Sequence, residues 1–328
     1  MNIYEIAEKA GVSIATVSRV LNNKGNISKK TYDKVMQVLK EYNYSPNAIA
    51  RGLALNSMNL IGIVVDDIRN LYRANAVYFL EDLFSKANFN TLIFNAGTKK
   101  GSLFSLILNQ RLDALVFVGS SFSNDKIAEF LSTHYDSMPI LMLNGGLPLP
   151  NVYSVICDES KGMETIVDHL YRENRKNPIY VTYSHSYPAS QRKYTGFLKK
   201  VQELGMNYNE SRLFTSGIEF DDGVRVGTQI INSGVKFDSV ICGLDLIAMG
   251  VMYVLKQYGY QIPEDVAITG FDNHIYGKLS APFLTSVDSN LDEMASLAVS
   301  VVLDCLNGKQ PEQKEFYVAP SLFLGGTT

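Results

Sequence analysis

The chain has 328 residues, which is long enough for two domains, or for two domains and a small appendage. Its 46% of hydrophobic and 19% of charged residues are typical of a globular protein with a substantial core. No run approaches the roughly 18 apolar residues of a membrane span, and the first residues, with Glu5 and Glu8, lack the apolar core of a signal peptide. We therefore expect a soluble protein of the cytoplasm.

Charge is distributed unevenly along the chain. The formal net charge is −3, but residues 1–57 contain eight basic and four acidic residues, a net of +4, so the remaining residues carry −7. A small basic head on an acidic body is typical of a nucleic-acid-binding module attached to another domain, although a basic head can also be ordinary solvated surface.

The first 45 residues predict three short helices. A first helix is expected to end at Gly11, and Ser13 and Ser28 are placed to cap a second and a third. Their apolar faces are formed in turn by Ile3, Ile6, Ala7 and Ala10, by Val17, Val20 and Leu21, and by Val35, Val38 and Leu39. Two short helices joined by a three-residue turn with a glycine form a helix-turn-helix, whose second helix lies in the major groove of DNA.

The outward face of the second helix has the chemistry of a DNA-reading surface. Arg19 is a long donor that suits guanine, and the side chains at the start of the helix allow close approach to base edges. Short polar side chains suit phosphate oxygens. We expect major-groove contacts from Ile14, Ala15, Arg19 and Asn26, and phosphate contacts from Ser13, Thr16, Ser18, Asn22, Ser28, Tyr44 and Asn47. A helical hairpin used for protein contacts is the alternative interpretation of the pattern.

The stretch "IYEIAEKAGVSIATVSRVLNNKGNISKKTYDKVMQVLKEYNYSPNAIARGLA" resembles the head of the lac-repressor (LacI/GalR) family of sugar-responsive transcription regulators. The segment "AGVSIATVSRVLN" is the most specific part of the likeness. The resemblance implies an all-α DNA-binding headpiece over residues 1–46, used as a homodimer on a pseudo-palindromic operator.

Residues 47–58 are predicted to form a hinge helix or a linker. "NAIARGLAL" is nine residues long with Gly52 inside, below the roughly 12–15 residues of a stable isolated helix. We expect it to order only on the operator, where two copies pair in the minor groove. Ala50 permits close approach, Arg51 meets the backbone or groove, and Leu53 is an apolar wedge between base steps. A plain linker is the alternative.

From residue 59 to residue 328 the pattern predicts an α/β body. Apolar runs such as "LIGIVV" and "LDALVFVG" alternate with helical segments, and the rhythm restarts at "NPIYVTYS", "DSVICGL" and "DVAITGFD". Two such units in tandem predict two doubly wound parallel-sheet lobes with a cleft between them. Ligands of such sheets bind outside the carboxyl ends of the strands.

The body also resembles the family's effector domain, which is similar to type I periplasmic sugar-binding proteins. The motifs "PEDVAITGFD", "GFDN" and "LDEMASLAV" carry the likeness. It implies three passages of the chain between the lobes, near 172–177, 287–291 and 317–320. The first lobe then comprises about 59–174 and 289–318, and the second comprises about 175–288 and 319–328. The helix around Asn75 to Leu83 is implied as a dimer surface.

Acidic and basic residues that follow predicted strands are the effector-binding candidates. Carboxylates and cations pair well with sugar hydroxyls, although any single Asp after a strand is equally a helix N-cap. By resemblance, Asp158, Asp245 and Asp272 stand where the family contacts its effector, and Phe220 where an aromatic ring stacks on the sugar. The full expected set is Asp66, Tyr72, Asp158, Arg192, Lys193, Phe220, Asp245 and Asp272.

Several positions depart from the family pattern. Lys193 stands at the usual place of an Arg, Leu244 at that of an Asn and Ser289 at that of a Gln. Asp66 and Arg73 replace a common Pro and Phe. The segment with Tyr183, Ser184, His185 and Tyr187 is unusually aromatic. Its side chains contact the ligand, form a lid over the cleft, or belong to an ordinary solvent-facing loop. We therefore expect a pocket whose side chains differ from those usual in the family, and these residues do not identify its ligand.

Other functional classes have little support. The chain has no GxSxG, P-loop or GxGxxG motif, and its four histidines lack metal spacing. Cys157, Cys242 and Cys305, without a CxxC, are expected to be buried reduced thiols. A secreted sugar-binding protein would leave the head unexplained. We expect no metal or cofactor, no enzymatic activity and, without a heptad tail, no tetramer. The sequence thus predicts a dimeric operator-binding regulator, a repressor of carbohydrate-utilisation genes, controlled by a sugar or phosphosugar in the cleft.

Overall fold

The computed structural model describes residues 3–21, 27–42, 57–97, 100–184 and 186–328. The chain divides into two compact units, Met1–Asn59 and Leu60–Thr328, hereafter the headpiece and the body. Most of the expected hinge, residues 47–56, lies outside the described residues. The same holds for the expected DNA contacts Asn22, Asn26, Tyr44, Asn47, Ala50, Arg51 and Leu53, and for His185.

The headpiece consists of three short helices, α1 (Ile3–Ala10), α2 (Ile14–Leu21) and α3 (Lys29–Glu41). Gly11 follows α1 with φ +58°, which suits glycine. The hydroxyls of Ser13 and Ser28 accept hydrogen bonds from the backbone N–H of Thr16 and Thr31, each at 3.2 Å, and cap α2 and α3. The predicted apolar faces meet in a core of Ile6, Ala7, Ala10, Val17, Val20, Val35, Val38 and Leu39. The helix-turn-helix prediction is therefore confirmed.

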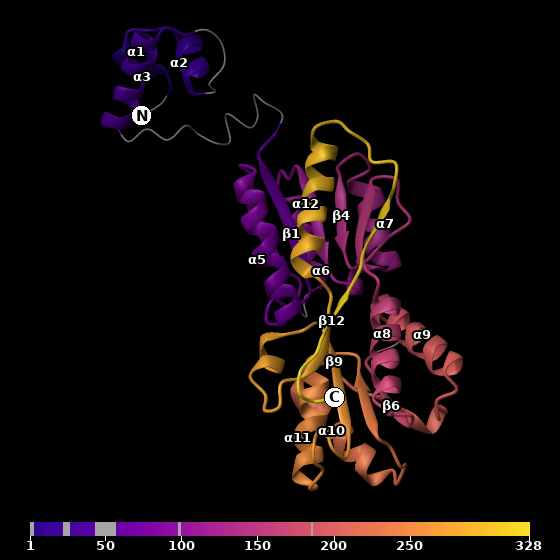
Figure 1. Ribbon diagram of the computed structural model, residues 1–328. Helices are drawn as coiled ribbons and strands as arrows, with labels where there is room; N and C mark the ends of the chain where they lie inside the picture. The colour runs from indigo at the N-terminus through magenta and orange to yellow at the C-terminus, as the bar shows by residue number, and fades with distance from the viewer. Residues whose placement is uncertain (1–2, 22–26, 43–56, 98–99, 185) are drawn as a thin grey trace. The chain divides into compact units, whose positions relative to one another are not determined.

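The first lobe of the body is built on a six-stranded parallel sheet in the order β11-β5-β4-β3-β1-β2 (Figure 1). Its strands are β1 (Leu60–Val65), β2 (Asn90–Asn95), β3 (Ala114–Val118), β4 (Ile140–Leu143), β5 (Val152–Cys157) and β11 (Glu315–Val318). Ile63 of β1 packs with one helical layer, α5 (Leu71–Lys86) and α12 (Leu291–Leu306). Val64 packs with the other, α6 (Lys100–Leu108) and α7 (Asp125–His134). Burial on both faces explains the continuous apolar runs.

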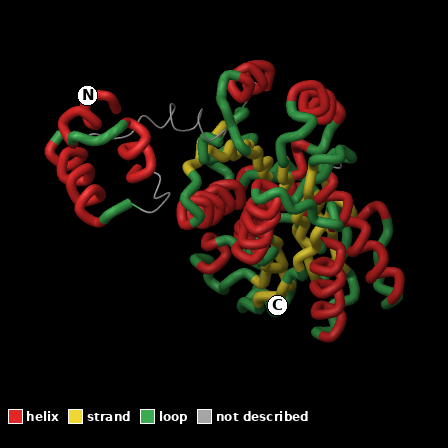
Figure 2. The backbone as a smooth tube through the Cα atoms, turned by 90° about the horizontal axis from the view of Figure 1, so that it is seen from above, coloured by secondary structure: helices red, strands yellow, loops and turns green. Residues whose placement is uncertain are grey.

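The second lobe repeats this design with the sheet order β12-β10-β9-β8-β6-β7. Its strands are β6 (Pro178–Thr182), β7 (Leu213–Thr215), β8 (Ser239–Cys242), β9 (Ala267–Phe271), β10 (Thr285–Asp288) and β12 (Ser321–Phe323), of which only β12 runs antiparallel, against β10. The helices are α8 (Glu159–Arg172), α9 (Pro188–Glu203), α10 (Phe220–Asn232) and α11 (Asp245–Gln257). Figure 2 shows the strands of the body enclosed by helices. The prediction of two doubly wound lobes is confirmed.

The chain first passes between the lobes earlier than expected. We placed this passage near 172–177, but α8 lies beside α9 on the second sheet (Figure 1). A Cβ on Gly162 of α8 would lie 3.0 Å from the ring of Phe271 in β9, and one on Gly196 of α9 would lie 2.2 Å from the carbonyl oxygen of Ser160. Such close packing fixes α8 in the second lobe, so the passage lies between β5 and α8. The other two lie between β10 and α12 and between β11 and β12.

The last residues of the chain complete the second lobe. Beyond β12, the Thr327 hydroxyl accepts a hydrogen bond from the Thr285 N–H at 2.9 Å and donates one to the Ile268 carbonyl at 2.6 Å. The Thr327 carbonyl accepts from the Ile268 N–H at 2.9 Å, and the residue is fully buried. No described helix combines the length and apolar character needed to cross a membrane.

Candidate functional site

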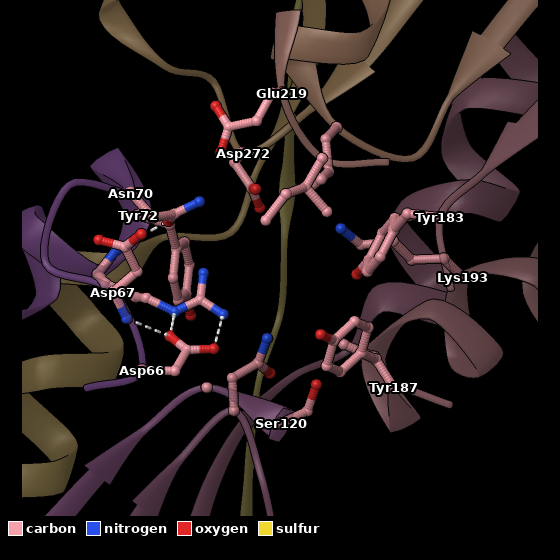
Figure 3. A pocket seen from close by; sticks show the side chains of 16 residues that line it. Asp66, Asp67, Asn70, Tyr72, Ser120, Tyr183, Tyr187, Lys193, Glu219 and Asp272 are labelled. Carbon is pink, nitrogen blue, oxygen red and sulfur yellow. Dashed lines mark hydrogen bonds and ion pairs between the residues drawn. The ribbon is translucent and has the colours of Figure 1, made fainter. Parts of the chain in front are cut away.

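A pocket lies where the carboxyl ends of the two sheets face each other (Figure 3). It encloses about 780 Å³, part of which is open to solvent. This is the edge at which ligands of open α/β sheets bind. The lining residues are Asp66, Asp67, Asn70, Tyr72, Arg73, Gly119, Ser120 and Asn144 from the first lobe, and Tyr183, Tyr187, Ala189, Lys193, Ile218, Glu219, Leu244 and Asp272 from the second.

On the first-lobe wall, the acidic side chains form ion pairs with basic residues of the same lobe. Asp66 follows β1 and forms a salt bridge with Arg73, whose Nη2 donates to the Asp66 carboxylate at 2.7 Å. The Ser121 hydroxyl donates to the same carboxylate at 2.8 Å. Beside this pair, the Arg69 side chain donates to both oxygens of Asp67 and holds the pKa of Asp67 at about 2. The charges on this wall are thus largely neutralised.

Tyr72 brings a polar atom without a partner into this wall. The side chain is 8% exposed, and its Oη has no hydrogen-bond partner among the described residues. Burial, and after it the charge of Asp272, raises the pKa of Tyr72 well above its ordinary value. The group is therefore a neutral phenol in the pocket, and an unpaired buried hydroxyl is costly unless a ligand or water meets it.

The second-lobe wall centres on Asp272, which follows β9 with φ +99°. Its side chain is 9% exposed, and His274 Nε2 lies 3.9 Å from its carboxylate, too far for a hydrogen bond. Lys193, 3% exposed, donates from Nζ to the Gly243 carbonyl at 2.9 Å and lies 3.8 Å from the ring centroid of Phe271. Figure 3 shows Asp272, Tyr183 and Lys193 directed toward Tyr72 across the pocket.

One hydrogen bond beside the pocket links the two lobes. Asn144 follows β4 in the first lobe, and its amide donates to Glu159 of α8 at 2.8 Å. Glu159 is 1% exposed and also accepts from Arg192 Nε at 2.6 Å and Nη2 at 3.2 Å. A ligand that touches Asn144 therefore lies next to a polar contact that joins the lobes.

Four of the eight predicted effector residues line the pocket: Asp66, Tyr72, Lys193 and Asp272. The structure places the other four elsewhere. Asp158 caps α8, the alternative considered for any Asp after a strand. Arg192, one position from Lys193, points away because neighbours on a helix lie about 100° apart, and it pairs with Glu159.

Asp245 and Phe220 also lie outside the lining residues. Asp245 is fully buried, and its carboxylate accepts from the Ser286 hydroxyl and the His274 N–H, each at 2.6 Å. Burial, and also the charge of Asp272, raises the pKa of Asp245 to about 8. Phe220 is 37% exposed, with its ring centroid 6.1 Å from that of Tyr253 on α11.

Several lining residues were absent from the predicted set. Gly119, Ser120 and Asn144 directly follow β3 and β4, so the rule that ligands bind after strands would have found them. Arg73, Leu244, Tyr183 and Tyr187 had been noted only as departures from the family pattern or as a loop. Ile218 and Glu219 come from the loop before α10, and no local signal marks them.

The headpiece presents a second candidate surface. On α2, Val17 and Val20 are buried, whereas Ile14 is 40% exposed and Ala15 and Arg19 are exposed. The hydroxyls of Ser13 and Thr16 are 2.9 Å apart, and those of Ser28 and Thr31 are 2.8 Å apart. Ser18 is half-buried. The outward face of α2 is therefore short, polar and open to a partner.

Cysteines and metal-ligating residues show no further site. Cys157 and Cys242 are buried and Cys305 is half-buried, all as free thiols. Among the described residues, no group of three or more His, Cys, Asp or Glu side chains is placed to hold a metal ion.

Comparison with known proteins agrees with this architecture. Residues 2–47 match the family described as bacterial regulatory proteins, lacI family, and residues 167–328 match a periplasmic binding protein-like domain. A transcriptional regulator of the helix-turn-helix type from Lachnoclostridium phytofermentans is 35% identical over 319 residues, 96% of each chain. The chain belongs to the LacI family. It is a DNA-binding transcriptional regulator, and the family's members are not enzymes.

More distant relatives cover the whole chain. Catabolite control protein A of Staphylococcus xylosus is 26% identical, over 100% of this chain and 99% of the relative. The lac repressor dimer bound to operator and the anti-inducer ONPF has a TM-score of 0.89 at 21% identity, over 100% and 98% of the two chains. The regulator CelR in complex with cellobiose has a TM-score of 0.75 at 21% identity, over 100% of both chains. These solved structures share the fold.

Proposed function

We propose that this LacI-family regulator is a repressor of carbohydrate-utilisation genes that binds a pseudo-palindromic operator as a homodimer. A sugar or phosphosugar in the pocket between the lobes changes its affinity for the operator. The observation that carries this proposal is the pocket itself. It joins a buried carboxylate, an unpaired phenol and aromatic side chains from two lobes of a chain whose other unit is a DNA-binding headpiece.

For the headpiece, we propose that α2 enters the major groove. Ile14, Ala15 and Arg19 then meet base edges, while the hydroxyls at Ser13, Thr16, Ser18 and Ser28 meet phosphate oxygens. The exposure of the outward face of α2 supports this placement. Contacts proposed for Asn22, Asn26, Tyr44 and Asn47, and minor-groove contacts for Ala50, Arg51 and Leu53, concern residues outside the described ones.

Exposed apolar side chains on the body support a homodimer. In the first lobe, Tyr78 on the helix proposed as a dimer surface is 66% exposed, and Leu106 is 55% exposed. In the second lobe, Tyr253 is 51%, Leu279 73% and Phe283 54% exposed. Tyr78 and Leu106 lie in the two opposite helical layers of the first sheet, so of these two only Tyr78 supports the proposed dimer helix. A dimer also doubles the contact with DNA, which one small headpiece needs for specific affinity.

For control, we propose that the ligand changes the angle between the two lobes. A molecule that touches Tyr72 on one side and Asp272 on the other favours the arrangement in which both are in reach. Because the headpieces join the first lobes, a change in the spacing of those lobes would alter how two headpieces meet the operator.

The test is selection of binding sites from random duplex DNA with the full-length protein, followed by operator-binding measurements with a panel of sugars and sugar phosphates. We expect an inverted repeat with two half-sites, and at least one compound that changes operator affinity tenfold or more. Selection of a single half-site would contradict the dimeric mode of binding. If no compound changed the affinity, the effector part of the proposal would fail and DNA recognition would stand.

A further inference from the structure

The charged side chains of the pocket indicate which class of sugar it accepts. Six of them line it: Asp66, Asp67, Arg73, Lys193, Glu219 and Asp272. Four are acidic and two are basic. Arg73 neutralises Asp66 and the adjacent Arg69 neutralises Asp67, so Glu219 and Asp272 against Lys193 leave an excess of one negative charge. A ligand with a phosphate or carboxylate group would have to overcome that field.

Both basic side chains of the lining already have partners. Arg73 is held by the Asp66 carboxylate. Lys193 donates to the Gly243 carbonyl and lies against the Phe271 ring. The neighbouring Arg69 is occupied by Asp67 in the same way. An anionic ligand would have to break an ion pair to gain a charge-assisted hydrogen bond from Arg73. At Lys193, which keeps donors beyond its bond to Gly243, it would share the pocket with the Asp272 carboxylate.

The helix ends around the pocket give the same indication. α10 begins with Glu219, Asp221 and Asp222, so carboxylates occupy its positive end. At α5, the Asn70 side chain accepts from the N–H of Arg73. Two helices begin at lining residues without a side-chain cap: α9 after Tyr187, and α11 after Leu244, where Asp245 places a carboxylate in the first turn.

The polar groups that lack partners suit hydroxyl groups instead. The carboxylate of Asp272 has no hydrogen-bond donor within bonding distance among the described residues, although its side chain is only 9% exposed. The Oη of Tyr72, from the other lobe, is equally unpaired. A carboxylate accepts from two adjacent hydroxyls, and a phenol both donates to and accepts from one. Figure 3 shows Asp272 and the ring of Tyr72 on different walls of the same pocket.

We propose that the ligand is a sugar without a phosphate or carboxylate group, bound by hydroxyls that meet Asp272 in the second lobe and Tyr72 in the first. This inference rests on the proposed function and narrows it, because it removes phosphosugars and sugar acids from the effector class. Tyr72 is then a specificity-determining residue. A ligand with an oxygen next to the Tyr72 hydroxyl gains a hydrogen bond. A ligand without one leaves this buried hydroxyl unpaired, which weakens binding.

The experiment is a thermal-shift and calorimetric comparison of matched sets on the full-length protein. Each set contains a neutral sugar, its phosphate ester and its uronic acid, for example glucose, glucose 6-phosphate and glucuronate, together with the corresponding galactose and mannose sets. For the set that binds, we expect the neutral sugar to raise the melting temperature and to bind at least tenfold more tightly than its anionic partners. A phosphate ester or uronate that binds as tightly would overturn this inference and leave the proposed function intact. If none of the neutral or anionic compounds bound, the proposed sugar effector itself would be refuted.

A second measurement addresses Tyr72 with the neutral sugar identified above. We expect Tyr72→Phe to weaken its binding about 3- to 10-fold, since one hydrogen bond is lost, and not to lower the melting temperature of the free protein, because it removes a buried hydroxyl that has no partner there. The matched control is Tyr258→Phe, at an exposed position after α11, which should bind the sugar as the unaltered protein does. Equal affinity of Tyr72→Phe and Tyr258→Phe would remove Tyr72 from the site.

Discussion

The two recognition surfaces of this regulator are built in opposite ways. α2 presents its candidate contacts on the outside of eight consecutive residues, where Arg19 is exposed. The pocket takes its lining from segments as distant as Asp66 and Asp272, and its basic side chains are already paired. An exposed, uncommitted cation suits a long polyanion, whereas a buried pocket with paired cations suits a small uncharged molecule. The comparison teaches that Arg19 keeps its charge in water, whereas Arg73 in the pocket is held by a carboxylate and Lys193 by a carbonyl and a ring.

The largest expected effect concerns salt. If each protein dimer neutralises about 6–10 phosphates, operator affinity should fall roughly 10³- to 10⁵-fold between 50 and 200 mM salt, because counterions are released on binding. Binding of a neutral sugar to the pocket should change little over the same range. Fluorescence anisotropy with labelled operator and calorimetry with the sugar measure the two. Operator binding that did not change with salt would contradict the proposal that the headpiece binds DNA through phosphate contacts.

The second effect concerns the pocket. Asp272→Ala should abolish the response of operator binding to the effector while operator affinity without effector stays the same, since the unpaired carboxylate is lost and the headpiece is untouched. Asp304→Ala is the matched control, because Asp304 is an exposed carboxylate paired with Lys309. The measurement is operator affinity with and without the effector for each variant. A full response in Asp272→Ala would place the effector elsewhere.

A smaller effect is expected on α2. Arg19→Ala should cost roughly 1–3 kcal/mol of operator binding and relax base preference at one position of each half-site. Lys40→Ala provides the control, because it removes one positive charge from the last turn of α3 without changing α2. Selection from random DNA reports the base preference of both variants. An unchanged profile in Arg19→Ala would take this residue off the base-reading surface.

The smallest effect follows from the buried carboxyl of Asp245. Its pKa is raised from 3.8 to about 8, so between these values the folded body binds more protons at this group than the unfolded chain does. This group should therefore lower the stability of the body progressively as pH rises from about 4 to 8. Among the described headpiece residues no carboxylate is buried, so no matching contribution is expected there.

The measurement is the melting temperature of the body between pH 5.5 and 8.5 in the unaltered protein and in Asp245→Asn. The amide keeps one hydrogen-bond acceptor but does not ionise in this range. We expect a shallower pH dependence in the variant, by a few degrees across the range. Parallel curves would show that Asp245 does not ionise in this interval.

The same contrast between local and distant residues decides what the sequence could predict. The three headpiece helices were predictable because their caps, turn and apolar faces lie within 45 consecutive residues. In the body, apolar runs predicted β1, β2, β3, β4, β6, β8 and β9. β5 was not predicted because Tyr153 and Ser154 interrupt its apolar run, although both side chains are buried. α8 was assigned to the wrong lobe because the passage near 172–177 was placed by resemblance alone.

For the pocket, position after a strand was a sound guide to Asp66 and Asp272 but did not fix the direction of a side chain. Asp158 and Asp245 follow strands as well, yet one caps a helix and the other is held by Ser286 and the His274 N–H. The pairing of Asp66 with Arg73 depends on how α5 begins, and the approach of Glu219 depends on packing between distant elements. Such contacts arise only from the tertiary fold.

Because the chain is synthesised from its amino terminus, β12 is made after the strands that it joins. The first sheet has all its strands once β11 has been made, whereas the second lacks β12 and the bonds of Thr327 until residues 321–328 have been made. Until then β10 exposes one open edge, which invites pairing with another chain. Asp272, whose N–H donates to Val287 of β10, sits next to that edge. Termination before β12 would therefore leave the headpiece complete and the edge of β10 uncovered.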